Sequence, residues 1–216
     1  MVEDIAFTCL QINLQHATAA TAAFSNRFQL LDHKIGFVQE PYATRVGDKY
    51  KISGINCGHL VYDNSKRPRA CLVFGRDFQY TALSHFITQD LVAATVELKT
   101  NGFQLKQVVC SGYHAPSNED PAVSRLLLKL IHYCRSNGLQ LIYGCDANAH
   151  NQLWGSKGTD RRGSELVEYI MEHELCCTGD IIAKNNDVTT ATSIKIGNGA
   201  TMQCQKCIAL LALHSI

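Results

Sequence analysis

The stretch LIYGCDANAHNQLWGS, residues 141–156, decides how the rest of the chain is interpreted. Its apolar beginning is typical of a buried strand, and this strand ends abruptly after Gly144 and Cys145, at Asp146. Asn148 follows two residues later, so a carboxylate and a carboxamide stand together where the chain leaves the core. Core packing does not explain such a pair. We therefore expect a functional site at the end of this strand.

On both sides of this stretch, runs typical of strands alternate with amphipathic helices. Thr18 is a candidate N-cap of the first helix, and the second helix is expected to start at Asp120 and to stop at Gly138. Residues 42–69 are rich in Gly, Asn and Lys and are expected to form a loop with short strands. The order predicts one layered α/β sandwich. Strands are expected at residues 5–14, 34–40, 69–75, 91–98, 104–116 and 139–146, and helices at 16–31, 120–138 and 161–175.

The composition is that of a chain with a large core and little net charge. It has 216 residues, of which 46% are hydrophobic and 18% charged, so a sizeable core can be buried. Its net charge is +1, whereas proteins that hold nucleic acid by charge alone usually carry a clear basic excess. Any role on nucleic acid must therefore rest on a local basic face or on a site.

The cysteines and the chain start point to a soluble intracellular protein. Most of the ten Cys lie inside apolar runs, where a reduced thiol behaves as a small hydrophobe. Cys204 and Cys207 have ligand-like spacing, but no second pair accompanies them, so we expect no zinc site. The first residues lack the basic region of a signal peptide, and no apolar run approaches the ~20 residues of a membrane span. We expect a monomer that does not contact membranes and has no targeting signal.

Polar residues stand at the ends of several of the expected strands. Carboxylates are hard oxygen ligands, and Mg²⁺ typically takes one or two of them together with phosphate oxygens and waters. Amides hold a phosphate oxygen or a water without adding negative charge. The pattern fits metal-assisted hydrolysis of a phosphoester, although Glu40 could also be a solvated acid at a strand end. The residues are Asn13, Glu40, Tyr113, Asp146 and Asn148.

Five segments, in their order along the chain, carry a resemblance to a known family. It is the endonuclease/exonuclease/phosphatase superfamily, which includes DNase I and the apurinic/apyrimidinic endonucleases. More closely, the chain resembles the endonuclease domain of non-LTR (LINE-type) retrotransposons. The resemblance covers about residues 5–175 and implies a DNase I-like, four-layered α/β sandwich. The segments are LQINLQHATAAT, FVQEPY, SGYHAPSNEDP, GCDANAHNQLWGS and DRRGSELVEYIMEHEL.

The resemblance implies a role for each of the five polar residues. Glu40 matches the Glu that binds the metal, which is Mg²⁺ or, as an alternative, Mn²⁺. Asn13 matches the Asn that supports metal and phosphate, and Tyr113 the Tyr that contacts the scissile phosphate. Asp146 matches the Asp that orients or activates the attacking water, and Asn148 the Asn that stabilises the transition state. The implied substrate is DNA.

Four residues downstream of Asp146 allow two interpretations each. His150 and Trp154 recur in similar members of the family, where they support the loop. We expect Trp154 to pack beneath this loop and His150 to satisfy a backbone carbonyl. Arg161 and Arg162 are possible contacts to a DNA phosphate, or they form an exposed pair before a helix.

The resemblance weakens after residue 175. The segment NNDVTTATSIKI, residues 185–196, is a degraded form of a later motif, and its Asp187 matches an Asp that orients a catalytic His. That His belongs to a terminal Ser-Asp-His motif, which this chain lacks; His214 follows Leu213 instead. Residues 176–199 therefore match poorly and residues 200–216 not at all. One hypothesis is a frameshift or a mis-spliced message, and an uninterrupted transcript encoding this tail would remove it.

The missing motif has expected consequences for fold and activity. We expect a strand of the family's second sheet to be missing after Cys177, which would leave apolar surface and a sheet edge uncovered. The alternative is that the apolar tail enters the sheet in its place. Losing an acid/base typically lowers a rate by about 10²- to 10⁴-fold.

We expect the protein to be a Mg²⁺-dependent endonuclease of retrotransposon origin that nicks DNA. Its activity is expected to be weakened or absent, and its expected location is the nucleus. A reverse transcriptase region of the same element would be its partner. The alternatives are a decayed fragment that binds DNA without cutting it and a phosphatase of the same superfamily.

Overall fold

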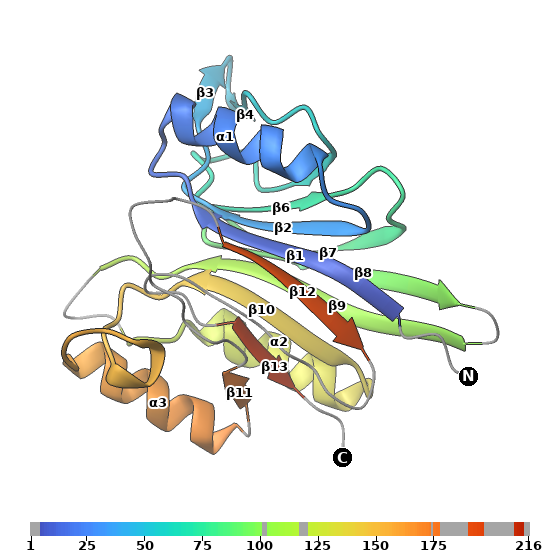
Figure 1. Cartoon of the computed structure of the whole chain (residues 1–216). Helices are drawn as coiled ribbons and strands as arrows, with labels where there is room; N and C mark the ends of the chain where they lie inside the picture. Colours follow the sequence, from blue (N-terminus) through green and yellow to red (C-terminus); the bar gives the residue numbers. More distant parts are fainter. Residues whose placement is uncertain are drawn as a thin grey trace.

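The computed structural model describes residues 5–100, 103–116, 121–173, 175–177, 190–196 and 210–213. Two sheets pack face to face, with helices on their outer sides (Figure 1). The strands are β1 Ile5–Asn13, β2 Lys34–Gln39, β3 Ala43–Val46, β4 Lys49–Ile52, β5 His59–Val61, β6 Ala70–Phe74, β7 Tyr80–Ile87, β8 Leu91–Thr100, β9 Phe103–Tyr113, β10 Gln140–Asp146, β11 Leu175–Cys177, β12 Thr190–Ile196 and β13 Leu210–Leu213. The helices are α1 Thr18–Gln29, α2 Arg125–Ser136, α3 Arg161–Glu172 and the short 3₁₀ turn η1 Gln152–Trp154.

Three separate hydrophobic clusters produce a four-layered sandwich. Successive side chains of a strand point to opposite faces, so a central strand can be apolar throughout and still serve two interfaces. In β2, Phe37 packs between the sheets while Val38 packs toward the α1 side. In β10, Ile142 packs between the sheets while Tyr143 packs toward α2 and α3. The predicted four-layered α/β sandwich is therefore confirmed.

Strand order places four strand ends at one edge. One sheet has the order β12-β1-β2-β6-β5, and the other has the order β11-β13-β10-β9-β8-β7. β1 runs parallel to β2, with Asn13 opposite Gln39. β9 runs parallel to β10, with Tyr113 opposite Asp146. Because parallel strands end at the same edge of a sheet, the predicted polar residues emerge close together.

The tail covers part of the edge that was expected to be open. β13 pairs antiparallel with β10, Leu210 lying opposite Gly144 and Ala212 opposite Ile142, and β11 pairs with β13 on its other side. The expectation of an uncovered β10 edge is thus wrong for Ile142–Gly144, and the alternative, in which the tail enters the sheet, is correct for residues 210–213. The apolar sequence of this run is typical of a strand. Asp187, Cys204, Cys207 and His214 lie outside the described residues.

Several element boundaries differ from the prediction because local hydrogen bonds set them. Thr18 is the first residue of α1, and its N-cap, Ala17, makes no capping bond through its side chain. α2 begins at Arg125 rather than at Asp120, because the Ser124 side chain accepts a hydrogen bond from the Leu127 N–H. The edge strand β7 was not predicted, since none of its side chains is fully buried and they form no apolar run.

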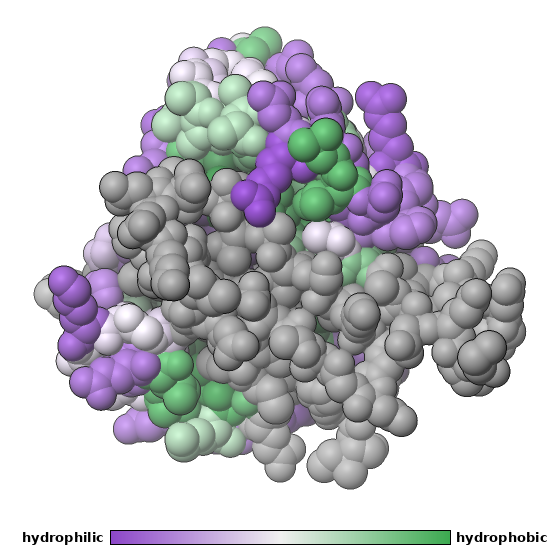
Figure 2. Space-filling view, viewed as in Figure 1, coloured by the Kyte–Doolittle hydropathy of each residue, from purple (hydrophilic) through white to green (hydrophobic). Residues whose placement is uncertain are grey.

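The helices and cysteines follow the expected burial pattern. In the view of Figure 2, hydrophilic side chains lie at the outer margin of the molecule near α3, as expected for a helix that buries one side against a sheet. Cys9, Cys57, Cys71, Cys110, Cys134 and Cys145 are buried thiols that take part in no disulfide, which confirms their expected role as core residues. None of the helices in the described part of the chain has the length and apolar character needed to cross a bilayer.

Candidate active site

A hydrogen bond between the two sheets forms the centre of the candidate site. The Asn13 side chain, at the end of β1, donates from Nδ2 to Oδ2 of Asp146, at the end of β10, over 2.6 Å. The other carboxylate oxygen, Oδ1, accepts a hydrogen bond of 3.1 Å from the Asn148 backbone N–H. Both oxygens of Asp146 are therefore held in place. The structure brings together three of the residues that the sequence assigned to one site.

Burial and hydrogen bonding shift the pKa of Asp146 in opposite directions. Burial raises the pKa of this carboxyl most strongly, and the negative charge of Glu40 raises it further. The hydrogen bonds from Asn13 and Asn148 act in the opposite direction, and the pKa remains above its ordinary value. Repulsion from Glu40 thus contributes to the raised pKa of Asp146, but burial is the larger cause.

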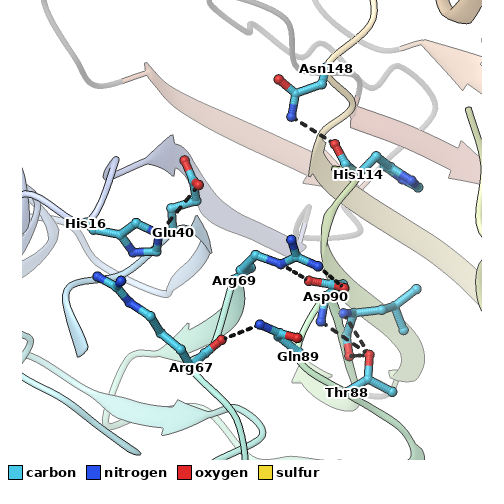
Figure 3. Close-up of polar contacts among 10 residues, drawn as sticks. His16, Glu40, Arg67, Arg69, Thr88, Gln89, Asp90, His114 and Asn148 are labelled. Carbon is cyan, nitrogen blue, oxygen red and sulfur yellow. Dashed lines mark hydrogen bonds and ion pairs between the residues drawn. The ribbon is translucent and has the colours of Figure 1, made fainter. Parts of the chain in front are cut away.

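The backbone after β10 turns sharply so that Asn148 faces the same edge. Asn148 has a φ of 44°, a left-handed conformation that Asn tolerates better than most residues. Its Nδ2 donates to the His114 carbonyl over 2.8 Å (Figure 3). The His114 N–H in turn donates to the Asp146 carbonyl over 2.9 Å. An amide nitrogen carries two hydrogens, so this bond fixes the side chain while leaving one donor.

Glu40 follows β2 directly and lies beside His16. The carboxylate Oε1 is 3.5 Å from His16 Nε2, and the His16 N–H donates to the Glu40 carbonyl over 2.8 Å. Glu40 and His16 both have positive φ angles, of 46° and 56°. Gln15 and Asn148 share this conformation, so four of the five non-glycine residues with positive φ in the described chain lie at this edge. Strained backbone of this kind is often concentrated at functional sites.

Tyr113 brings a phenol hydroxyl to Glu40. Burial raises its pKa, and the charges of Glu40 and Asp146 and a hydrogen bond with Glu40 raise it further, while Arg69 opposes them. The hydroxyl therefore stays protonated and can donate a hydrogen bond. Glu40, Tyr113 and Asp146 thus influence one another electrostatically, which supports a single shared site.

The two arginines at the start of α3 have different environments, and neither precedes the helix. Arg162 is buried and donates to the carbonyls of Asn148, over 3.1 Å, and Ala147, over 3.3 Å. It is therefore not available as a DNA contact and does not belong to an exposed pair; its charge supports the loop that presents Asn148. Arg161 is half-exposed and pairs with Glu165 on the same helix. A DNA contact by Arg161 stays a prediction.

The loop that follows Asn148 is closed by Trp154 and Asp160. Trp154 is buried and donates from Nε1 to the Ala149 carbonyl over 3.1 Å, which confirms that it packs beneath the loop. Asp160 caps α3 through the Gly163 N–H and also accepts from the His150 N–H. The backbone of His150 is thus part of the closure. The predicted bond from its side chain to a carbonyl stays a prediction.

Sequence reasoning missed a polar network that joins the sheets behind the site. Gln39 is fully buried and donates from Nε2 to Ser111 Oγ over 3.0 Å and to the Gly144 carbonyl over 3.3 Å. Gln11 donates to the Cys145 carbonyl over 2.8 Å. A signal was present, because Gln11 lies within the largely apolar strand β1 and Gln39 ends the largely apolar strand β2. Buried polar groups need such partners, so the network fixes the spacing of the sheets next to Asp146.

Sequence reasoning also missed the ion pair between Arg69 and Asp90. Arg69 precedes β6 and Asp90 precedes β8, so the pair connects the two sheets at the same edge as the candidate site (Figure 3). The available signal was a single charged residue directly before the buried run Ala70–Phe74. His16 was missed as well, and only its position after Asn13 could have indicated it.

The carboxylates suit a hard divalent cation better than zinc. Among the residues that the structure describes, no three His, Cys, Asp or Glu side chains cluster as a metal cage. Glu40 and Asp146 are oxygen donors close enough for the charge of one to raise the pKa of the other. Mg²⁺ commonly needs only one or two protein carboxylates, with phosphate and water completing its shell, so this donor set fits it.

Comparison with known proteins gives a family match for part of the chain and a fold match for most of it. The family described as "Endonuclease-reverse transcriptase" matches residues 107–194, which include Tyr113, Asp146 and Asn148. Comparison with curated protein sequences gives no match.

Solved structures with similar folds include one retrotransposon domain and two bacterial proteins. The endonuclease domain of TRAS1, a telomere-specific non-LTR retrotransposon, is 23% identical with a TM-score of 0.59, covering 87% of this chain and 84% of that domain. An endonuclease/exonuclease/phosphatase family protein from Bacteroides thetaiotaomicron is 11% identical with a TM-score of 0.54, covering 97% and 84%. A mannosyl-6-phosphatase from the same organism is 10% identical with a TM-score of 0.50, covering 95% and 85%. The chain therefore has the DNase I-like fold of the endonuclease/exonuclease/phosphatase superfamily.

Proposed function

We propose that this chain is a Mg²⁺-dependent endonuclease that nicks DNA by hydrolysing a phosphodiester bond. The observation that carries the proposal is the Asn13–Asp146 hydrogen bond of 2.6 Å, which joins the ends of β1 and β10 beside Glu40 and Tyr113. A carboxylate with both oxygens held is suited to orient an attacking water, because its position is fixed before substrate binds.

The other residues have chemically complementary roles. Tyr113 retains its proton and can donate to a non-bridging phosphate oxygen, and Asn148 can donate its second amide hydrogen to the charge that develops there. Asn13 keeps Asp146 oriented. These donors are placed before the reaction, so little reorganisation is needed when negative charge accumulates on phosphorus-bound oxygens.

Mg²⁺ would be held by Glu40, with Asp146 near it, and Mn²⁺ would suit the same oxygen donors. When bound, the cation neutralises negative charge on the phosphate. Without a cation, Glu40 and Asp146 place negative charge where a negatively charged phosphodiester must bind. This electrostatic conflict supports the proposal that the site works with a divalent metal.

DNA is proposed as the substrate because of two similarities. The TRAS1 endonuclease domain shares the fold, and the family that matches residues 107–194 is described as "Endonuclease-reverse transcriptase". We therefore propose a retrotransposon origin, with a reverse transcriptase region as partner and the nucleus as the place of action.

Two alternatives keep specific support. A sugar-phosphate phosphatase is one, because the mannosyl-6-phosphatase has a similar fold. A DNA-binding protein that cuts poorly is the other, because the Ser-Asp-His ending is missing from the sequence. Among the described residues, the side-chain hydrogen bonds of Asp146 involve Asn13 and Asn148, and neither can act as an acid/base.

Nicking of supercoiled plasmid separates these functions. Wild-type protein should convert it to the open circular form with Mg²⁺ and not with a chelator, and Asp146→Ala should lower the rate at least about 10²-fold. Asp77→Asn is the control, because Asp77 pairs with His33 away from this edge and should leave the rate unchanged. Release of phosphate from mannose 6-phosphate without nicking would favour the phosphatase. Plasmid binding without nicking would favour the decayed endonuclease.

A further inference from the structure

The Arg69 guanidinium, from the sheet that contains β6, is held by two residues of the opposite sheet. Its Nε and Nη2 donate to the two oxygens of the Asp90 carboxylate over 2.5 and 2.6 Å. Its Cζ lies 5.2 Å from the centre of the Tyr113 ring. A forked ion pair fixes the direction of a guanidinium, and an aromatic neighbour restricts its plane. Arg69 is therefore oriented before any ligand binds.

The partner carboxylate is itself fixed by the turn between β7 and β8. Thr88 Oγ1 accepts hydrogen bonds from the N–H groups of Asp90 and Leu91. The Gln89 carbonyl accepts from the N–H groups of both Arg69 and Ala70, over 2.8 and 3.0 Å. This turn is therefore fastened to the segment that carries Arg69, and Asp90 does not depend on the ion pair for its position.

Arg69 also contacts two of the proposed site residues. Its carbonyl accepts a hydrogen bond of 2.9 Å from the Glu40 N–H, and the Asp90 carbonyl accepts one of 2.8 Å from the Tyr113 N–H. Tyr113 and Glu40 contribute to the electrostatic environment of Arg69. The ion pair therefore belongs to the candidate site rather than to a separate part of the surface.

One nitrogen of Arg69 is not used by these contacts. Nη1 has no hydrogen-bond partner among the described residues, although the side chain is only 31% exposed. In Figure 3, this third nitrogen points away from Asp90, into the space between Glu40 and the His114–Asn148 pair. A purely structural clamp would be complete with Nε and Nη2, so the remaining N–H groups are available to a ligand at the site.

We propose that Arg69 binds the phosphate of the substrate, donating from Nη1 to a non-bridging oxygen while Asp90 holds the rest of the guanidinium. This assignment rests on the proposed phosphodiester substrate and adds a binding residue to it. Asp90 offsets most of the charge of Arg69, so the contribution is a directed hydrogen bond rather than a net positive field. Planar N–H donors match phosphate oxygens in a way that the point charge of Lys does not.

The test uses Arg69→Lys, with Arg67→Lys as a matched control two residues earlier on the exposed surface. The nick position is first mapped with wild-type protein, and duplexes are then made with oxygen, or with sulfur in the Rp or Sp position, at that phosphate. On the oxygen substrate, Arg69→Lys should lower kcat/KM roughly 10- to 100-fold, as expected for one charged hydrogen bond. On the diastereomer whose sulfur replaces the oxygen bound by Arg69, the loss of kcat/KM caused by Arg69→Lys should be much smaller. Sulfur accepts hydrogen bonds poorly, so the wild-type protein has already lost this contact on that substrate.

Three results would overturn the assignment. The first is an equal loss of kcat/KM on the oxygen, Rp and Sp substrates, which would mean that Arg69 only positions Tyr113 and Glu40. The second is no loss in Arg69→Lys on any substrate. The third is the same loss in Arg67→Lys as in Arg69→Lys. Asp90→Asn, which keeps the volume of Asp90 but frees the guanidinium, should show the same selective loss, and thermal melting checks that both variants fold.

A binding measurement separates this assignment from the proposed activity. If wild-type protein does not nick DNA, the proposed activity fails, and fluorescence anisotropy with a labelled duplex in Ca²⁺ decides about Arg69. Arg69→Lys should then raise the Kd roughly 10-fold, whereas Arg67→Lys should not. Equal affinities, or no binding by wild-type protein, would overturn the assignment.

Discussion

The environment of Asp146 differs from that of a carboxylate that only stabilises a fold. A carboxylate used only for stability would be either solvated or paired with a cation, whereas Asp146 is substantially buried and held by two neutral donors. Its folded-state pKa lies above that of the unfolded chain, so folding favours the protonated form. The corresponding contribution to stability is present at low pH and is lost as the pH rises through the folded-state pKa. The protein therefore tolerates a cost at neutral pH to keep a charged, oriented carboxylate.

The neighbours of Asp146 should shift its pKa in opposite directions. Asn13→Ala removes the hydrogen bond to Oδ2 and should raise the pKa, while Glu40→Gln removes a nearby negative charge and should lower it. The measurement is the pH titration of the Asp146 carboxyl carbon by NMR in the absence of divalent metal. Asn26→Ala, on the exposed side of α1, is the control and should leave the titration unchanged. Shifts in the same direction for both variants would contradict this account of the site.

At the scale of elements, local signals predicted most of the fold. The buried runs 35–38 in β2, 70–74 in β6 and 141–145 in β10 are apolar because both faces of each strand are covered, and such runs are easily recognised. β7 was missed because an edge strand needs little apolar sequence, and the start of α2 was misplaced because Ser124, not Asp120-Pro121, provides the cap. The convergence of the polar strand ends was predictable, since it follows from strand direction.

The loop from Asn148 to α3 depends on one capping residue. Asp160 accepts hydrogen bonds from Gly163 and His150; burial acts to raise its pKa, but these bonds outweigh it, so the pKa is lowered. Asp160→Ala should therefore cost about 0.5–2 kcal/mol of stability at neutral pH, whereas Asp160→Asn, also a good cap, should cost less. A lowered pKa means that this contribution is present above the unfolded-state pKa and is lost as the pH falls through the folded-state pKa. Urea unfolding at pH 7 and at low pH measures the loss of stability in each variant. A loss in Asp160→Ala that is as large at low pH as at pH 7 would contradict the role of the charge.

At the scale of the molecule, the site exists because two sheets meet. Asn13 and Glu40 come from one sheet, and Tyr113 and Asp146 from the other. Hydrogen bonds of Gln11, Gln39 and Asn13 and the Arg69–Asp90 pair cross between them. Sequence patterns assign residues to strands but not to partners across a sandwich, which is why Arg69 and Asp90 were not predicted. The position of the tail was left open for the same reason, because a short apolar run can pair at any open edge.

The direction of β13 bears on the missing acid/base. β13 runs antiparallel to β10, from Leu210 opposite Gly144 to Ala212 opposite Ile142, so it leads away from Asp146. Ala212 is level with a residue four positions before Asp146, roughly 13 Å away along the strand at the usual rise per residue. An acid/base must approach the reacting oxygens to about 3 Å. His214 follows Ala212 by two residues in the sequence, and we therefore expect that it does not act in catalysis.

His214→Ala should leave plasmid nicking unchanged, whereas Asp146→Ala should abolish it. Ala212→Pro tests the strand separately: proline removes a backbone donor and should weaken the pairing with β10, lowering the melting temperature without selectively affecting the chemistry. The rates are compared at a temperature where all variants are folded, as judged by circular dichroism. A large loss of nicking in His214→Ala, with an unchanged melting temperature, would show that the tail supplies the acid/base after all and that the chain is a complete enzyme rather than a weakened one.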